Sequence, residues 1–342
     1  MNINALRSRK TLFDAMAMWK ALSDTFEIAY FQLPGVTLRA TGADSRVGRI
    51  LLAAFAHLRV PEDSAQGPVF DWRLTDIPEA AGRGLGLPDH SQYGRFDMTP
   101  CGDLQIEWRG PVVTVFRPEA RQISTFCMSG KRIRGDQSAK PLLRFLFSML
   151  EPHGMYLAHA ALIGRPDVGL LVTGKGGVGK STIAAACASH GATFAGDDFV
   201  AISHCAGQWW GHSLFSTIML FHDQAQKFPM LTDAERNCEL DDTRKAVLSL
   251  AEKHNVFLTR HMRIDAAARP DVVACSASSL RTVRKCEVGL ALAPHSTFAS
   301  PSRSPKQTEF LLDLAADLPS LVFCSGSDLE HTVTPLRDRY DF

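Results

Sequence analysis

The sequence lacks the features that mark zinc-binding, membrane-spanning and nucleic-acid-binding proteins. Its eight cysteines form no Cys-x-x-Cys pair and no His spacing that resembles a zinc site. No apolar run approaches the roughly 20 residues that cross a bilayer, and residues 11–22, which follow a basic N-terminus, are interrupted by Asp14 and Lys20, so no signal peptide is expected. With 37 basic and 36 acidic residues the net charge is +1, so we expect neither nucleic acid nor membrane as a partner.

The remaining composition is that of an ordinary globular protein. Hydrophobic residues make up 45% and charged residues 21% of the 342 positions, a length that favours two domains. Scattered cysteines of this kind predict reduced thiols and a cytoplasmic location. A Pro- and Gly-rich stretch at 61–89 reads as a linker, which predicts an N-terminal domain over residues 1–95 and a second domain over residues 96–342.

Local patterns predict both helices and strands. Strand-like runs at 104–108, 112–116 and 122–128 predict an antiparallel meander. The other expected strands are 26–33, 156–163, 168–172, 192–195, 199–203, 208–212, 288–293 and 321–324, and the expected helices are 141–150, 181–190, 243–254 and 307–318.

One motif in this pattern carries chemistry. The run GKGGVGKST matches the glycine-loop pattern G-x-x-x-x-G-K-[ST] that cradles nucleotide phosphates, and it follows an expected strand and precedes an expected helix, as the motif requires. It predicts binding of a nucleotide phosphate with Mg²⁺, with Lys180 at the outer phosphates and Ser181 on the metal. The predicted nucleotide-binding residues are Gly174, Lys175, Gly176, Gly177, Val178, Gly179, Lys180, Ser181 and Thr182.

Two adjacent carboxylates follow the next expected strand. Asp197 and Asp198 come after Gly196, where a strand beside the loop strand would deliver them to the phosphates. One carboxylate can ligate metal while the other takes the proton from an attacking hydroxyl. Because side chains alternate along a strand, this sharing requires a twist or turn at Gly196.

His159 lies in the expected strand directly before the loop strand. A histidine in an apolar strand is either a satisfied core residue or, this close to the loop, a functional one, and the sequence leaves both interpretations open.

The order of these blocks resembles bacterial HPr kinase/phosphorylase and its HPr-kinase-like relatives, including those of lasso-peptide and other peptide-modifying gene clusters. The blocks are HAAL from His159, GLLVTGKGGVGKST from Gly169 and HGATFAGDDFVAI from His190, followed by HSLF, KAVLSLAEKH, ALAPHSTF and LPSLVFCSGSDL. The resemblance runs from about Gly102 to the end.

The resemblance implies an ATP-dependent serine kinase. Its fold would be an α/β P-loop kinase domain of the HPr kinase / phosphoenolpyruvate carboxykinase type with a mixed sheet, preceded by a smaller α+β N-terminal domain. By position, the resemblance implies Asp197 as the general base, Asp198 with Ser181 on the metal, and Lys180 and His159 as further catalytic residues; the two aspartates could be reversed. The implied partner is a peptide or protein with an acceptor serine, and family members often form homo-oligomers, so the N-terminal domain would serve substrate recognition or oligomerisation.

The chain departs from true HPr kinases in one respect. No E-[IV]-R-G signature follows the acid pair, so HPr itself is not the expected substrate, and Lys245, Arg260 and Arg263 are candidates to replace the missing charge.

Two alternative functions remain open. KGGVGKST also resembles the deviant loop of dimerising ATPase switches, in which Lys175 would reach across a dimer interface, and a kinase with a small-molecule acceptor would share the same ATP site.

Overall fold

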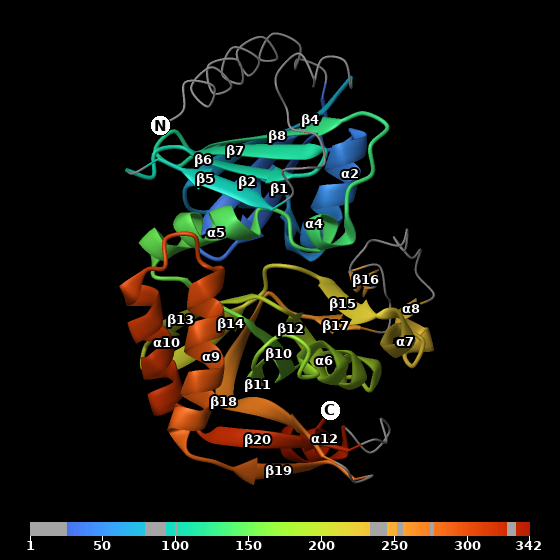
Figure 1. The fold of residues 1–342 in the computed structure, drawn as a ribbon, viewed down its shortest axis with the longest axis vertical. Coiled ribbons are helices and arrows are strands. Elements are labelled where there is room, and N and C mark those ends of the chain that lie inside the picture. The colour runs from blue at the N-terminus through green and yellow to red at the C-terminus, as the bar shows by residue number, and fades with distance from the viewer. Residues whose placement is uncertain are drawn as a thin grey trace. The chain divides into compact units, whose positions relative to one another are not determined.

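The structure is a computed structural model that describes residues 26–78, 94–99, 101–232, 245–251, 256–273, 277–326 and 333–342. It consists of two compact units (Figure 1). The first unit comprises the described residues up to Ala53 together with Leu58–Phe145, and the second comprises Ala54–His57 with Leu146–Phe342. The expected interrupted segment 11–22 lies outside the described residues.

The first unit is built on one eight-stranded sheet with strand order β3-β1-β2-β4-β8-β7-β6-β5. The expected antiparallel meander is confirmed as β6, β7 and β8. The strands are β1 Ile28–Leu33, β2 Val36–Thr41, β3 Arg59–Val60, β4 Val69–Ile77, β5 Arg95–Met98, β6 Gln105–Arg109, β7 Val112–Arg117 and β8 Gln122–Met128; the helices are α2 Arg46–Leu52 and α4 Gly135–Ala139, with a short 3-10 turn η3 Glu62–Ser64. Most of a further 3-10 turn, η2 Ala53–Leu58, belongs to the second unit.

The division between the units comes later in the chain than the expected boundary at residue 95. The physical reason is strand pairing, because β8 pairs in parallel with β4 and thereby joins the meander to the N-terminal strands. Strand β4 itself lies inside the stretch 61–89 that the sequence predicted as a linker. The chain between the two units runs through α5 Leu143–Leu150, close to the helix expected at 141–150.

The second unit holds a ten-stranded mixed sheet, whose main path is β17-β12-β10-β11-β18-β14-β13-β9, with β20 paired to β18 and β19 paired to β20. Its strands are β9 Tyr156–Ala158, β10 Ala160–Arg165, β11 Val168–Thr173, β12 Thr193–Gly196, β13 Val200–Cys205, β14 Gln208–His212, β17 Phe257–Leu258, β18 His261–Val272, β19 Ser279–Thr282 and β20 Ser320–Ser325. A separate pair is formed by β15 Thr217–Phe221 and β16 Lys245–Ser249. The helices are α6 Lys180–Ser189, α7 His222–Ala225, α8 Pro229–Thr232, α9 Lys285–Ala299, α10 Pro305–Asp317 and α12 Thr334–Tyr340, with a 3-10 turn η5 Glu151–His153.

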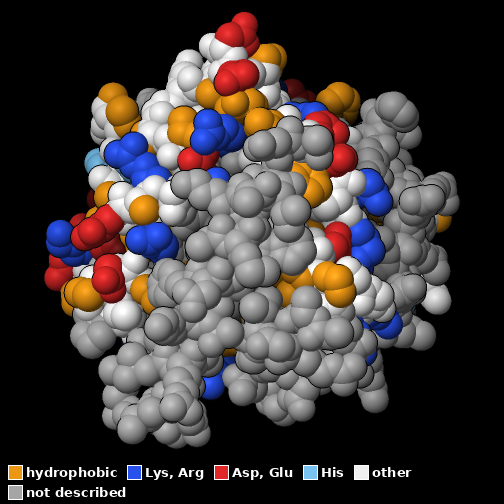
Figure 2. All heavy atoms as spheres, turned by 90° about the horizontal axis from the view of Figure 1, so that it is seen from above, with side chains coloured by type: hydrophobic (Ala, Val, Ile, Leu, Met, Phe, Trp, Pro, Cys, Tyr) orange, Lys and Arg blue, Asp and Glu red, His pale blue; other side chains and the backbone are white. Residues whose placement is uncertain are grey.

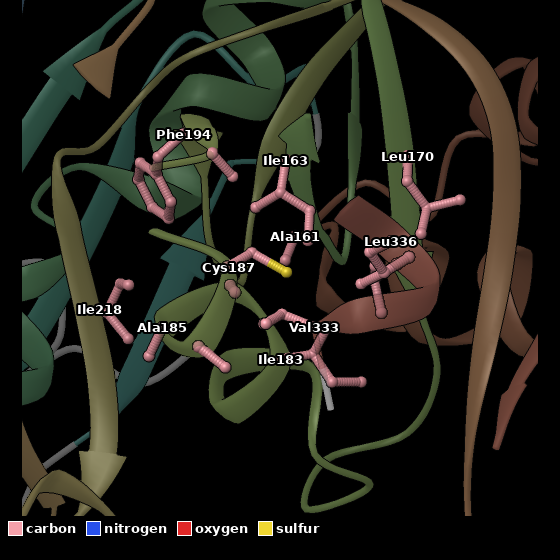
Figure 3. Packing of buried hydrophobic residues seen from close by; sticks show 14 of the residues in the cluster. Ala161, Ile163, Leu170, Ile183, Ala185, Cys187, Phe194, Ile218, Val333 and Leu336 are labelled. Carbon is pink, nitrogen blue, oxygen red and sulfur yellow. The ribbon is translucent and has the colours of Figure 1, made fainter. Parts of the chain in front are cut away.

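Alternating side chains of the central strands supply two hydrophobic cores. Leu170 and Val172 of β11 pack with α6 and α12 on one face of the sheet (Figure 3). Leu171 of the same strand packs with residues of α9 and α10 on the other face, where these two helices lie side by side (Figure 1). Successive side chains of a strand point to opposite faces of the sheet, and those of β11 are apolar on both. The central sheet is therefore covered on both faces.

Two expected elements are wrong. The predicted helix at 243–254 is replaced, where described, by strand β16, and the predicted strand at 288–293 lies inside helix α9. The expectation of a mixed α/β protein is confirmed, whereas the phosphoenolpyruvate carboxykinase type stays a prediction.

One face of the molecule shows how charged side chains are distributed. In the described part of the face shown in Figure 2, basic and acidic side chains lie interspersed among apolar ones. Among the described helices, none is long and apolar enough to cross a membrane.

Candidate nucleotide and phosphoryl-transfer site

The glycine loop joins the end of β11 to the start of α6. Gly177 and Gly179 have φ angles of 84° and 99°, in the left-handed region that favours glycine, and a Cβ at Gly174 would lie 3.0 Å from Val178 Cγ2. Gly179 caps α6 without a side-chain hydrogen bond. The first N–H groups of α6 are therefore not capped by a side chain, and such groups bind anions.

Lys180 begins α6 and lies against the loop. Its side chain is buried, and Nζ donates hydrogen bonds to the carbonyl oxygens of Gly174 at 2.8 Å and Lys175 at 3.2 Å. Lys175, by contrast, is exposed. The loop thus holds one buried and one exposed lysine on the same short segment.

Asp197 and Asp198, the acid pair, lie at the edge of the sheet where β11 ends and the glycine loop begins, which we call the loop edge. The strand pairing that brings them there differs from the expected one. Strand β12, which precedes the acids, does not pair with β11, because β10 lies between them and is antiparallel to both. Two antiparallel steps give β12 and β11 the same direction, so their carboxyl ends still meet at one edge of the sheet.

Asp197 lies next to the loop helix. Its Oδ1 accepts a hydrogen bond from Ser181 Oγ at 3.1 Å, and its Oδ2 is buried and has no hydrogen-bond partner within the described part of the chain. Burial, and then the charge of Asp198, raise the pKa of this carboxyl to about 6. A buried carboxylate oxygen without a partner beside a serine hydroxyl fits a divalent cation, since hard cations prefer oxygen ligands.

Asp198 points to a different partner. Its Oδ1 lies 2.7 Å from His159 Nε2. The φ angle of Asp198 is 65°, and the N–H of Phe199 donates to the carbonyl oxygen of Asp197 at 2.8 Å. The chain therefore makes the turn that the two carboxylates need in order to share a site. The residue in the left-handed conformation is Asp198, whereas the turn was expected at Gly196.

His159 sits at a break between strands. The single strand expected at 156–163 is divided here into β9, which pairs with β13, and β10, which pairs with β11. The imidazole stacks on Phe199 with ring centroids 5.1 Å apart, and the carbonyl oxygen of His159 accepts a hydrogen bond from Thr173 Oγ1 at 3.2 Å. His159 therefore contacts both the acid turn and the last residue of the loop strand.

Helix α9 fixes this histidine from the other side. The backbone N–H of His159 donates to Ser296 Oγ at 2.8 Å, and Ser296 Oγ donates to the carbonyl oxygen of Leu292 at 2.7 Å. Sequence reasoning missed this contact, because the two residues lie far apart in the chain and no motif links them.

We expect Ser296→Ala to lower the free energy of unfolding by about 1 kcal/mol, because it leaves the part-buried N–H of His159 without this partner. Urea unfolding would measure the change. Ser189→Ala is the matched control: Ser189 Oγ donates a similar bond to the carbonyl oxygen of Ala185 at 2.8 Å, but within the described residues it accepts none. An equal loss in both variants would contradict the expectation.

The three basic residues proposed to replace the missing signature charge lie in different surroundings. Arg263 donates to the carbonyl oxygen of Asp167, at the end of β11 opposite to the loop. Lys245 Nζ lies 5.2 Å from the ring centroid of Phe221, and the charge of Arg260 acts on His57. Arg263 is therefore not a residue of the loop edge.

Comparisons with known proteins add little to this geometry. No protein-family model and no curated protein matches the sequence. Among solved structures, the HPr(Ser) kinase/phosphatase from Coxiella burnetii is similar over 54% of this chain and 89% of its own, with 12% identity and a TM-score of 0.29. A TM-score and a sequence identity this low do not establish a shared fold or family, so the family that the sequence blocks resemble stays a prediction.

Proposed function

We propose that this protein is an ATP- and Mg²⁺-dependent kinase that transfers the γ-phosphoryl group to a serine hydroxyl of a peptide or protein, for example a lasso peptide precursor. The observation that carries the proposal is the separation of the two carboxylates. Asp197 faces the loop serine, and Asp198 faces a histidine that is held by hydrogen bonds. Phosphoryl transfer needs this division between a metal ligand and a base for the acceptor.

The loop side of the site would hold the nucleotide. The loop amides, the N-terminus of α6 and Lys180 bind phosphate oxygens, and Ser181 Oγ and Asp197 Oδ2 hold Mg²⁺. The metal supplies positive charge to the phosphates. The described residues contain no cluster of three or more His, Cys, Asp and Glu that could hold a metal, so phosphate oxygens of the nucleotide would have to supply the remaining ligands of Mg²⁺.

The acceptor side reverses the roles that the resemblance implied for the two aspartates. Asp198 is the general base, because its side chain is 25% exposed whereas Asp197 is 2% exposed and bonded to Ser181. During transfer, a bond forms between the serine oxygen and the γ-phosphorus, the bond to the β–γ bridging oxygen breaks, and the serine proton moves to Asp198. His159 orients this carboxylate through Nε2.

A second candidate function rests on the exposure of Lys175. In a dimerising ATPase switch this lysine would reach the phosphates of a second copy, and water would accept the phosphoryl group. The two functions differ in the acceptor and in the dependence of the rate on protein concentration.

Intact-mass spectrometry distinguishes them. A serine-containing precursor peptide from the neighbouring genes is incubated with the protein, Mg²⁺ and ATP, with Lys180→Ala and a peptide whose serines are alanines as controls. We expect a gain of one phosphate in the wild-type reaction alone. No gain, with ATP hydrolysis that rises steeply with protein concentration, would support the switch instead.

A further inference from the structure

Helix α9 brings a second histidine to the loop edge. Two hydrogen bonds fix this part of the helix to the site: the carbonyl oxygen of Ala291 accepts from Thr173 Oγ1 at 3.4 Å, and Ser296 Oγ accepts from the N–H of His159 at 2.8 Å. Thr173 is the last residue before the glycine loop. His295 lies between these two anchors, so the position of its backbone is set by the loop strand and by His159.

The imidazole of His295 is close to the site but makes no polar contact among the described residues. It is half-buried, and its ring centroid lies 6.3 Å from that of His159, with the ring planes at 73°. Over the described ranges, neither of its ring nitrogens has a hydrogen bond or an ion pair. A half-buried imidazole therefore presents N–H and lone-pair positions that the protein does not use.

The charges of nearby basic groups act on this imidazole. The pKa of His295 is lowered by burial first, and then by the positive charges of His159, Lys180 and Lys175. The last two are the lysines of the glycine loop. The two lysines, the imidazole and the uncapped helix N–H groups offer positive charge and donors on the loop side of the acid pair, and such groups bind multiply charged anions.

We propose that His295 is a phosphate-binding residue of the nucleotide site, whose ring N–H donates to an oxygen of the β- or γ-phosphate of ATP. This inference rests on the proposed function for the identity of the anion. His295 would replace part of the positive charge that the sequence lacks after its acid pair. A bound phosphate also opposes the charges of the two lysines, so binding favours the imidazolium and strengthens the hydrogen bond.

The experiment compares the dissociation constants of Mg-ATP and AMP, by calorimetry, for the wild-type protein and three variants. His295→Phe keeps a ring but removes both nitrogens, His295→Gln keeps an N–H donor without charge, and His190→Gln is the control. His190 lies at the far end of α6 from the loop, where its ring bonds to the carbonyl oxygen of Ala186. Circular dichroism melts verify that each variant folds.

We expect His295→Phe to weaken Mg-ATP binding about tenfold, His295→Gln to weaken it less, and both to leave AMP binding and the control unchanged. An unchanged dissociation constant for Mg-ATP, with slower transfer, would overturn the inference, because His295 would then act only by packing against His159. An equal weakening of AMP and Mg-ATP would overturn it as well.

The outcomes separate this inference from the proposed function. If wild-type protein binds Mg-ATP but phosphorylates no serine peptide, the kinase proposal fails, and a selective loss of Mg-ATP binding in His295→Phe still supports the phosphate contact. If the kinase phosphorylates its peptide and His295→Phe binds Mg-ATP normally, only the inference fails. A wild-type protein that binds no Mg-ATP overturns both.

Discussion

Asp197→Asn is expected to increase the stability of the protein without bound metal at neutral pH while abolishing phosphoryl transfer. The folded state raises the pKa of Asp197 from its ordinary value of 3.8 to about 6, because the carboxyl is buried and lies beside Asp198. The difference of about two between these pKa values corresponds to about 3 kcal/mol of unfavourable ionisation in the folded state. Asparagine has no ionisation cost and keeps an oxygen for the hydrogen bond from Ser181 Oγ. Its amide NH₂ takes the buried position of Oδ2, which has no partner, so part of the gain is offset.

The pH dependence of this effect has a definite sign. Between about pH 4 and 6 the unfolded chain has released the proton of Asp197 while the folded protein retains it, so the wild-type stability falls as the pH rises through this window and stays reduced above it. The asparagine variant does not titrate there. We therefore expect its advantage to be largest at pH 7–8 and to disappear near pH 4, as measured by urea unfolding in EDTA.

Asp198→Asn is the matched control for this stability gain. Asp198 is partly exposed and bonded to His159 Nε2, so its replacement removes no buried, unpartnered charge. A gain in Asp198→Asn as large as that in Asp197→Asn would contradict the account. Adding Mg²⁺ with ATP should reverse the ranking, because only the wild-type carboxylate offers the cation an ionised ligand.

The parts of the site that are local in sequence could be predicted from it. The glycine loop, the strand before it and the helix after it lie within a short segment, and the structure places β11, the loop and α6 there. Gly191, which follows that helix, has a φ angle of 94°, in the left-handed region that favours glycine after a helix end. Turn and cap preferences act over a few residues, so a motif contains the information that they need.

Errors arose where local patterns were ambiguous. Residues 288–293 are a short apolar run before Pro294, a pattern that predicts a strand, but they lie inside a longer helix in which Pro294 is tolerated. Strand β4 was missed because the stretch 61–89 is rich in Pro and Gly, although Phe70, Trp72 and Leu74 alternate with polar residues in the manner of a strand.

The relationships that define the candidate site are not local, and they required the structure. The spacing of the two aspartates gives no indication that they point to different partners. That difference depends on the positive φ of Asp198 and on Ser296 of α9, which holds His159 from a distant part of the chain. A single sequence contains the residues of this arrangement but not their pairing.

Asp198→Asn should reduce the rate of phosphoryl transfer by about 10²- to 10⁴-fold, the range typical for the loss of a general base. Asparagine is the appropriate replacement because it tolerates the left-handed conformation that Asp198 adopts at φ 65°. The turn, and with it the position of Asp197, should therefore be preserved. Its amide can still bond to His159, but it cannot accept the serine proton.

Single-turnover transfer to the precursor peptide measures this loss, and calorimetry with Mg-ATP shows whether binding persists. We expect the dissociation constant of Mg-ATP to change little in Asp198→Asn and to rise in Asp197→Asn, since only Asp197 is bonded to Ser181. Transfer by Asp198→Asn within about tenfold of the wild-type rate would assign the base to Asp197 instead, because general-base catalysis accounts for at least a hundredfold. The same pair of variants therefore determines which carboxylate serves the metal and which serves the acceptor.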